Sequence, residues 1–367
     1  MTSSWLWVVF TVIAAFMQTL RNAMQRELTG KLGTVGATHV RFLFGFPFVI
    51  VFLLGVMLAT GASLPRPGLS FWPWAILGAF AQVAATALML AAMGERSFVV
   101  TIAYIKTEPI QVAVFGLLFL GDTVTVPMTT AIIVATSGVV IMSTKPGGMI
   151  GGIRPTLIGL ASGGMFALSA IGFRGAILDL ALPNYVMAAT STLAVGIAMQ
   201  AVVLSVYLAL RSPTVLFAIF RAWKPSLSAG LAGAVASQFW FLAFALATAA
   251  SVRTLALIEV LFAQLVARIA FGQRTSAREA LGMLLVVAGV ALLLWAYCLL
   301  SAHALRERDR PKGGGGGRFR LVSLATSPCT GEENKPLQLN SSGRTGSGAK
   351  AMPSSCSSSA SSAVASP

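Results

Sequence analysis

Long apolar segments, separated by short polar breaks, follow one another along most of the chain. A helix rises about 1.5 Å per residue, so about 20 apolar residues cross the hydrocarbon core of a bilayer. Segments of roughly this length lie at 5–24, 37–59, 72–93, 98–119, 126–144, 155–175, 184–209, 226–247, 251–271 and 277–300. The pattern predicts an all-α integral membrane protein with about ten transmembrane helices.

Composition agrees with this prediction and excludes an ordinary soluble enzyme. Of the 367 residues, 56% are apolar and 10% are charged, whereas a soluble domain has about 25% charged residues. The net charge is +15, but basic residues beside apolar segments are typical of membrane-surface anchors, so no nucleic-acid partner is expected. We also expect no metal and no cofactor, because His39 and His303 are far apart and the chain has no CxxC or HExxH motif.

The apolar region divides near Gly148 into two sets of five segments, which predicts two domains, residues 1–148 and 149–303. An odd number of spans in each half places the halves in opposite orientations. This is the inverted-repeat design of many secondary transporters. Residues 304–367 are rich in serine and glycine and are predicted to form a disordered, low-complexity tail.

Weak self-similarity between the halves supports a repeat. The fourth and ninth segments align at a shift of 151 residues, which pairs Glu108 with Glu259. A shift of 153 residues is also defensible and pairs Arg21 with Arg174. The first register is preferred because it also aligns the helix end and the turn that follows it.

The ends of the segments carry signals for location and orientation. No basic residue precedes Trp5, and no clear cleavage site follows the first segment, so we expect no cleaved signal peptide. A multi-pass location in the cell membrane, such as the bacterial inner membrane, is expected. Tryptophan pairs at 5 and 7 and at 72 and 74 are predicted interfacial anchors. Counted by lysine and arginine, both termini would lie outside.

Ionisable side chains are rare inside the apolar segments, where each costs about 2.5–3.5 kcal/mol on insertion scales. The deepest are Lys106, Glu108 and Glu259. Lys106 and Glu108 are two residues apart, so on a helix they point to different sides and need separate partners or a water-filled cavity. Pro109 removes a backbone donor and disfavours helical geometry at Glu108. These residues are predicted to line a translocation path; a fixed ion pair such as Lys106 with Glu259 is the alternative.

Further residues extend the candidate path. Polar and aromatic candidates are Gln82, Gln111, Gln238, Gln264, Tyr104 and Trp240. For each of them alone, hydrogen bonding between helices or ordinary packing is the alternative. Arginines near the segment ends, which are predicted to snorkel to the interface or to act in gating with Pro109, are Arg21, Arg41, Arg174, Arg253 and Arg268.

Several short motifs resemble those of the EamA-type carriers of the drug/metabolite transporter superfamily, over about residues 5–300. The motifs are Arg41 at the start of the second segment, KTEP at 106–109, LGD at 120–122, and IEVLF followed by FGQ at 271–273. Asp122 and Gln273 stand where the family usually has glutamate. The resemblance implies a cavity lined by the third, fourth, eighth and ninth helices, termini on the cytoplasmic side, and a small organic solute that is commonly exported. The orientation of the termini therefore stays open.

We accordingly predict a secondary transporter that moves small organic metabolites or drugs by alternating access, as a monomer or homodimer. Glu108 and Glu259 are candidate coupling groups, because a carboxyl group in a low dielectric can carry a proton. An integral-membrane enzyme is one alternative, but the few isolated acidic residues and two distant histidines form no catalytic constellation. A channel or structural membrane protein is the other, although no filter-like loop is visible.

Overall fold

The computed structural model describes residues 5–95, 104–143, 153–262, 264–265 and 276–308. The chain divides into two units, residues 1–316 and 317–367, and all described residues belong to the first. Of the predicted tail only 304–308 are described, as the end of a helix. The predicted boundary near Gly148 falls within the first unit, and the two domains stay a prediction.

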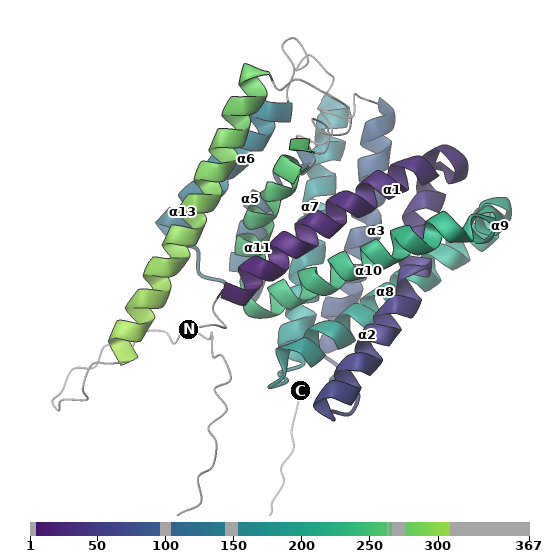
Figure 1. The fold of residues 1–367 in the computed structure, drawn as a ribbon, viewed down its shortest axis with the longest axis horizontal. Coiled ribbons are helices and arrows are strands. Elements are labelled where there is room, and N and C mark those ends of the chain that lie inside the picture. Colours follow the sequence, from purple (N-terminus) through teal and green to yellow (C-terminus); the bar gives the residue numbers. More distant parts are fainter. Residues whose placement is uncertain (1–4, 96–103, 144–152, 263, 266–275, 309–367) are drawn as a thin grey trace, which may run out of the picture. The chain divides into compact units, whose positions relative to one another are not determined.

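The described part of the chain is all-α (Figure 1). Its elements are α1 (Leu6–Leu43), α2 (Gly45–Thr60), α3 (Phe71–Glu95), α5 (Glu108–Phe115), the π-helical η2 (Gly116–Leu120), α6 (Val126–Ser143), α7 (Ile153–Asp179), α8 (Tyr185–Arg211), α9 (Pro213–Arg221), α10 (Trp223–Leu246), α11 (Ala249–Leu255), the 3₁₀ turn η3 (Ala256–Ile258) and α13 (Ala277–Arg308).

Six stretches are long and apolar enough to cross a membrane. They are Val35–Thr60, Phe71–Met89, Leu157–Asp179, Tyr185–Arg211, Trp223–Leu246 and Ala277–Leu299. Shorter apolar helices at Leu6–Asn22, Glu108–Leu120 and Val126–Met142 overlap three further predicted segments. By their length and composition, these helices confirm the expectation of a multi-pass membrane protein.

Glycine separates the first two predicted segments inside α1. Gly33 has φ 67° and ψ 173°, a conformation that residues with a side chain rarely adopt. The apolar helix before it ends near Asn22, and the next candidate span begins at Val35 and runs on into α2. One helical element therefore contains the first predicted segment and the start of the second.

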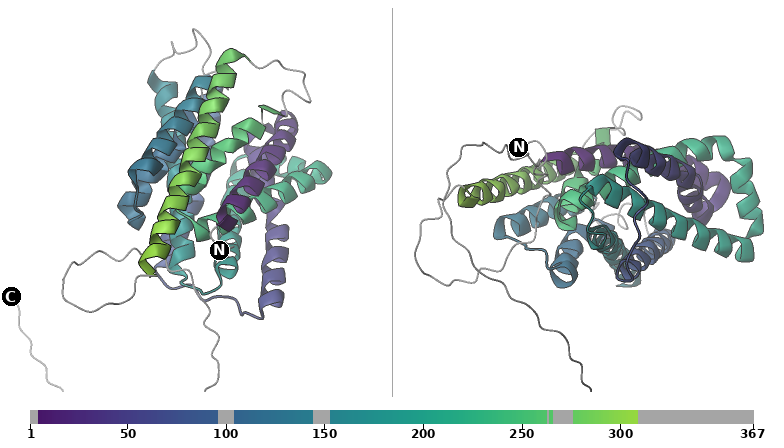
Figure 2. Two further views of the ribbon diagram at one scale, coloured as in Figure 1. Left: turned by 60° about the vertical axis from the view of Figure 1, so that its left-hand side comes forward. Right: turned by 90° about the horizontal axis from the view of Figure 1, so that it is seen from below.

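Three long helix pairs organise the fold, and each joins one helix from each predicted half. The pairs are α1 with α10, α3 with α7, and α6 with α13. The two helices α6 and α13 run side by side, and α1 lies along α10 (Figure 1; Figure 2). Extensive packing between the halves positions the site described below.

Backbone contact between α6 and α13 is possible because glycines lie at the crossing. A Cβ added at Gly138 would lie 2.6 Å from the carbonyl oxygen of Gly282, and one at Gly289 would lie 2.6 Å from the Cβ of Ala135. Such close approach of helices is typical of membrane proteins. Lipid gives no hydrophobic driving force between helices, so they associate through the close packing that small residues allow.

The variant Gly138→Ala is therefore expected to lower the free energy of unfolding by about 1–3 kcal/mol, because the new methyl group overlaps backbone atoms. The matched control is Gly55→Ala on α2, where nothing lies within 4 Å of the added Cβ. There the better helix propensity of alanine is expected to stabilise by about 0.5–1 kcal/mol. Thermal melting in detergent compares the two, and equal melting temperatures would contradict the crossing.

Trp7 is not the interfacial anchor that the sequence predicts. Its side chain is fully buried, and its ring packs edge-to-face on Tyr297 with centroids 5.2 Å apart. Trp5 is 41% exposed and also faces Tyr297. Trp7 therefore packs α1 against α13 and is not exposed at the protein surface.

Candidate functional site

Four deep charged residues form two ion pairs that cross between the predicted halves. Lys106 pairs with Glu259, and Arg253 Nε lies 2.9 Å from Glu108 Oε1. All four side chains are largely buried, with exposed fractions from 11% to 19%. Each half thus contributes one cation and one anion, and each charge is neutralised by the other half. We call them the crossed pairs.

A helix break brings Lys106 and Glu108 to the site. Lys106 and Thr107 form a turn, and α5 begins at Glu108. Pro109 lies in the first turn of α5, where its missing N–H would have no helical partner. The predicted non-helical geometry at Glu108 is therefore wrong, because the break lies just before it. The carboxylate of Glu108 at a helix start also complements the helix dipole.

A second break brings Arg253 to the site. Helix α10 ends at Leu246, and Thr248 caps α11 by accepting a hydrogen bond from the Ser251 N–H at 3.3 Å. Arg253 lies in the last turn of α11, where a cation complements the helix dipole. The pair of Arg253 and Glu108 therefore joins two short helices: α5 begins inside the predicted segment 98–119, and α11 begins between the predicted segments 226–247 and 251–271.

Gln18 and Trp240 link the crossed pairs to each other. The Gln18 amide donates to Glu259 Oε2 at 2.7 Å, and the indole N–H of Trp240 donates to Gln18 Oε1 at 3.1 Å. The guanidinium of Arg253 lies 5.1 Å from the centroid of the Trp240 ring. Trp240 is among the residues predicted from the sequence, whereas Gln18 is not, although it is the one glutamine within the first apolar segment.

Two further arginines meet at α10, and no carboxylate among the described residues pairs with either of them. A Cβ added at Gly233 would lie 3.3 Å from both Arg21 Cδ and Arg41 Cγ. Arg21 is 6% exposed, and its Nη2 donates to Asn22 Oδ1 at 2.8 Å. The buried Nε and Nη1 of Arg21 and Nε of Arg41 have no hydrogen-bond partner among the described residues. The charges of Arg21 and Arg41 repel each other and that of Arg253.

Arg174 holds the C-terminal end of α10. Its Nη1 donates to the carbonyl oxygen of Phe244 at 2.7 Å and also to that of Ala247, and its Nη2 lies 3.3 Å from Asp122 Oδ1. Arg174 and Arg253 therefore point into the protein. Snorkelling to the interface, one of the two roles predicted for these arginines, does not fit these contacts.

Most predicted glutamines form hydrogen bonds between helices. Gln82 accepts from Gln200 at 2.6 Å, and Gln238 donates to Thr190 at 2.7 Å. Gln111 donates to the Leu160 carbonyl at 3.3 Å. These bonds join α3 with α8, α10 with α8, and α5 with α7, so the packing interpretation fits them.

The remaining predicted residues lie apart from the crossed pairs or outside the description. Tyr104 packs on α7, because a Cβ at Gly159 would lie 2.9 Å from its Cβ. Within the described residues, no hydrogen bond or ion pair connects Gln264 to the crossed pairs. Arg268 and Gln273 lie outside the described residues.

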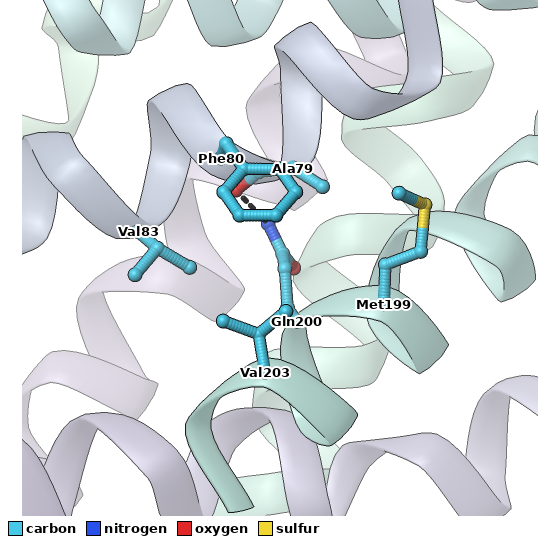
Figure 3. A pocket seen from close by; sticks show the side chains of 6 residues that line it. All are labelled: Ala79, Phe80, Val83, Met199, Gln200 and Val203. Carbon is cyan, nitrogen blue, oxygen red and sulfur yellow. Dashed lines mark hydrogen bonds between the residues drawn. The ribbon is translucent and has the colours of Figure 1, made fainter. Parts of the chain in front are cut away.

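A small pocket lies between α3 and α8 (Figure 3). It is a shallow depression without room for a water molecule, and it is lined by Ala79, Phe80, Val83, Met199, Gln200 and Val203. The amide of Gln200 donates to the Ala79 carbonyl at 3.4 Å. Ligand pockets usually measure about 300–1,000 Å³, and this pocket shares no residue with the crossed pairs. It therefore does not define the solute path.

Comparison with known proteins identifies the fold but no family. No protein-family model and no curated protein matches the sequence. A solved structure described only as "Crystal structure of protein" matches with a TM-score of 0.61 at 15% sequence identity, covering 80% of this chain and 98% of that chain. An identity this low shows a shared fold alone, so the resemblance to EamA-type carriers stays a prediction.

Proposed function

We propose that this protein is a secondary transporter that moves a small organic solute by alternating access. The observation that carries the proposal is the crossed arrangement of Lys106, Glu108, Arg253 and Glu259 between two sets of helices. Charge inside a membrane protein is costly and usually lies on a solute or ion path. Helices that are interrupted within a segment, as the fourth segment is by the turn before α5 and the ninth by η3, are typical of transporter sites near mid-membrane.

The packing of the long helices supports two inverted halves, residues 1–148 and 149–303, with ten transmembrane helices. Numbered along the chain, α1 and α10 are the first and eighth segments, and α3 and α7 are the third and sixth. If the two halves are interchanged, the first segment becomes the sixth and the eighth becomes the third. The pair of α1 and α10 is thus converted into the pair of α7 and α3. The pair of α6 and α13, the fifth and tenth segments, is converted into itself.

Individual contacts support the same symmetry at the predicted shift of 151 residues. The shift relates Gly138 to Gly289 and Ala135 to Val286. A Cβ at Gly289 would lie 2.6 Å from Ala135 N, and one at Gly138 would lie 2.8 Å from Val286 N. Each contact is thus the image of the other, as a pseudo-two-fold axis between α6 and α13 requires.

The crossed pairs suggest how alternating access would operate. With both pairs formed, the halves are joined by two largely buried ion pairs in a low dielectric. Rocking of one half against the other requires that these bonds be exchanged for bonds to the solute or to a coupling ion. Each carboxylate of one half pairs with a cation of the other half. Binding of a solute or ion to that carboxylate is therefore linked to the orientation of the halves.

Purified protein in liposomes tests the proposal, with solutes first selected by thermal stabilisation of the protein. We expect saturable flux with counterflow, and we expect Glu108→Gln and Glu259→Gln each to lower it by about tenfold or more, the effect of one lost charged bond. Glu279→Gln is the matched control. Its side chain caps α13 through the Ser276 N–H at 2.8 Å, and glutamine can replace it in that role.

Other outcomes would assign a different function. Unsaturable conductance would indicate a channel, and product formation would indicate an enzyme. Full flux in both variants of the crossed pairs would overturn the proposed path.

A further inference from the structure

We propose that the transported solute carries a carboxylate or phosphate group, which binds to Arg21 and Arg41 beside the middle of α10. This inference rests on the proposed transport function and adds the chemical class of the solute. The charge balance of the site, the position of the two arginines, and the hydrogen bonds that they lack support it.

The charge balance leaves an excess of two positive charges. Around the Trp240 and Gly233 face of α10, the described cations are Lys106, Arg253, Arg21 and Arg41, and the described anions are Glu108 and Glu259. The crossed pairs neutralise two cations with two anions. Arg21 and Arg41 then remain without a described carboxylate, and an uncompensated buried charge is strongly unfavourable.

The aliphatic parts of the two arginines pack beside the middle of α10, a candidate membrane span, and transporters hold their solutes near mid-membrane. Gly233 is ten residues from the first residue of α10 and thirteen from the last, which places it about 15 Å along the helix and near its middle. Glycine provides the space for both side chains there. Trp240 lies seven residues further, on the same face of α10 and about 10 Å away.

The free donors are suited to an oxyanion. Arg21 is 6% exposed, yet two of its three guanidinium nitrogens have no partner within the described part of the chain, and Arg41 Nε has none either. A guanidinium presents N–H donors in a planar fork that matches the oxygens of a carboxylate or phosphate. An anion between the two arginines would satisfy these donors and relieve their mutual repulsion, whereas a neutral acceptor would leave the repulsion in place and a cation would add to it.

The first test is ligand-induced thermal stabilisation in neutral detergent at constant ionic strength. The probes are inorganic phosphate, glycerol 3-phosphate and succinate, with glycerol and choline as neutral and cationic controls. We expect at least one anion to raise the melting temperature of the protein, and the controls not to. In Arg21→Gln and Arg41→Gln the affinity for that anion is expected to fall about tenfold or more, whereas the exposed Arg211→Gln is expected to behave as wild type.

A second measurement separates binding from a structural role. Because the described hydrogen bond of Arg21 joins it only to the neighbouring Asn22, and no carboxylate among the described residues pairs with it, Arg21→Gln is expected not to lower the melting temperature without anion, whereas loss of a structural arginine would lower it. Absence of stabilisation by every anion, or equal stabilisation of wild type and Arg21→Gln, would overturn the inference. So would a lower melting temperature of Arg21→Gln without anion.

Lipid and solute are distinguished by vesicles of neutral phosphatidylcholine with or without anionic phosphatidylglycerol. Stabilisation by phosphatidylglycerol alone, without any effect of the small anions, would assign the arginines to a lipid headgroup and overturn the solute proposal. Flux in the neutral vesicles separates this inference from the proposed function. Saturable flux of neutral solutes that is unaffected by Arg21→Gln would support the transport function and overturn the anionic solute. Absence of any flux would overturn the transport function itself.

Discussion

Lys106→Met is expected to destabilise the protein by about 3–5 kcal/mol, because it leaves the carboxylate of Glu259 buried without its cation. The Gln18 amide donates to one oxygen of Glu259 and cannot replace the charge. This loss is a large share of an ordinary stability of about 5–15 kcal/mol. Thermal or denaturant unfolding in detergent would measure it.

The double variant Lys106→Met with Glu259→Gln separates the two interpretations of this ion pair. Removal of both charges is expected to recover most of the lost stability, since no unpaired charge remains. If the pair lies on the path, transport stays low in the double variant even though the fold recovers. Recovery of both stability and flux would instead identify a fixed structural pair. Additive losses in the double variant would contradict the contact itself.

The sequence identifies the deep charges because charge is rare in an apolar segment. Lys106, Glu108 and Glu259 are predicted for that reason, and the separate partners expected for Lys106 and Glu108 follow from their spacing on a helix. The structure confirms the separate partners. These predictions depend on local chemistry, which a sequence contains in full.

Partners supplied by distant helices are not visible in the sequence. Arg253 lies near a predicted segment end, where an arginine reaches the interface as readily as the interior, and only the packing of α11 beside α5 assigns it to Glu108. Gln18 resembles Gln82 or Gln238 in its sequence context. It joins the crossed pairs only because α1 lies along α10, which brings its amide between Glu259 and Trp240.

The same limit applies to helix breaks. A proline in an apolar segment predicts a helix break nearby. The residue at which the helix breaks depends on which backbone groups find hydrogen-bond partners. The Thr107 N–H bonds to the Tyr104 carbonyl at 3.2 Å, so the turn forms before Pro109 and leaves Glu108 helical. No proline or glycine marks the break between α10 and α11, at Ala247 and Thr248, but the hydropathy pattern places it correctly, between the predicted segments 226–247 and 251–271.

Arg174→Met is expected to lower stability by about 3–5 kcal/mol, because it orphans one carboxylate and two carbonyl groups at once. Asp122 would lose its cation, and the carbonyl oxygens of Phe244 and Ala247 would lose their donor at the end of α10. Arg174→Lys is expected to be intermediate, because one ammonium cannot reproduce the fork of a guanidinium. Unfolding in detergent measures both variants, with the exposed Arg211→Met as control.

Substitution of Arg174 is also expected to affect transport, because Arg174 lies close to the elements that carry the crossed pairs. The carbonyls that it binds end the helix that carries Trp240, and α11 with Arg253 begins two residues after Ala247. Release of this end would let Trp240 and Arg253 move relative to each other, so flux in Arg174→Lys is expected to fall further than its stability alone explains. A variant that melts like wild type and transports at full rate would show that the break between α10 and α11 needs no such anchor.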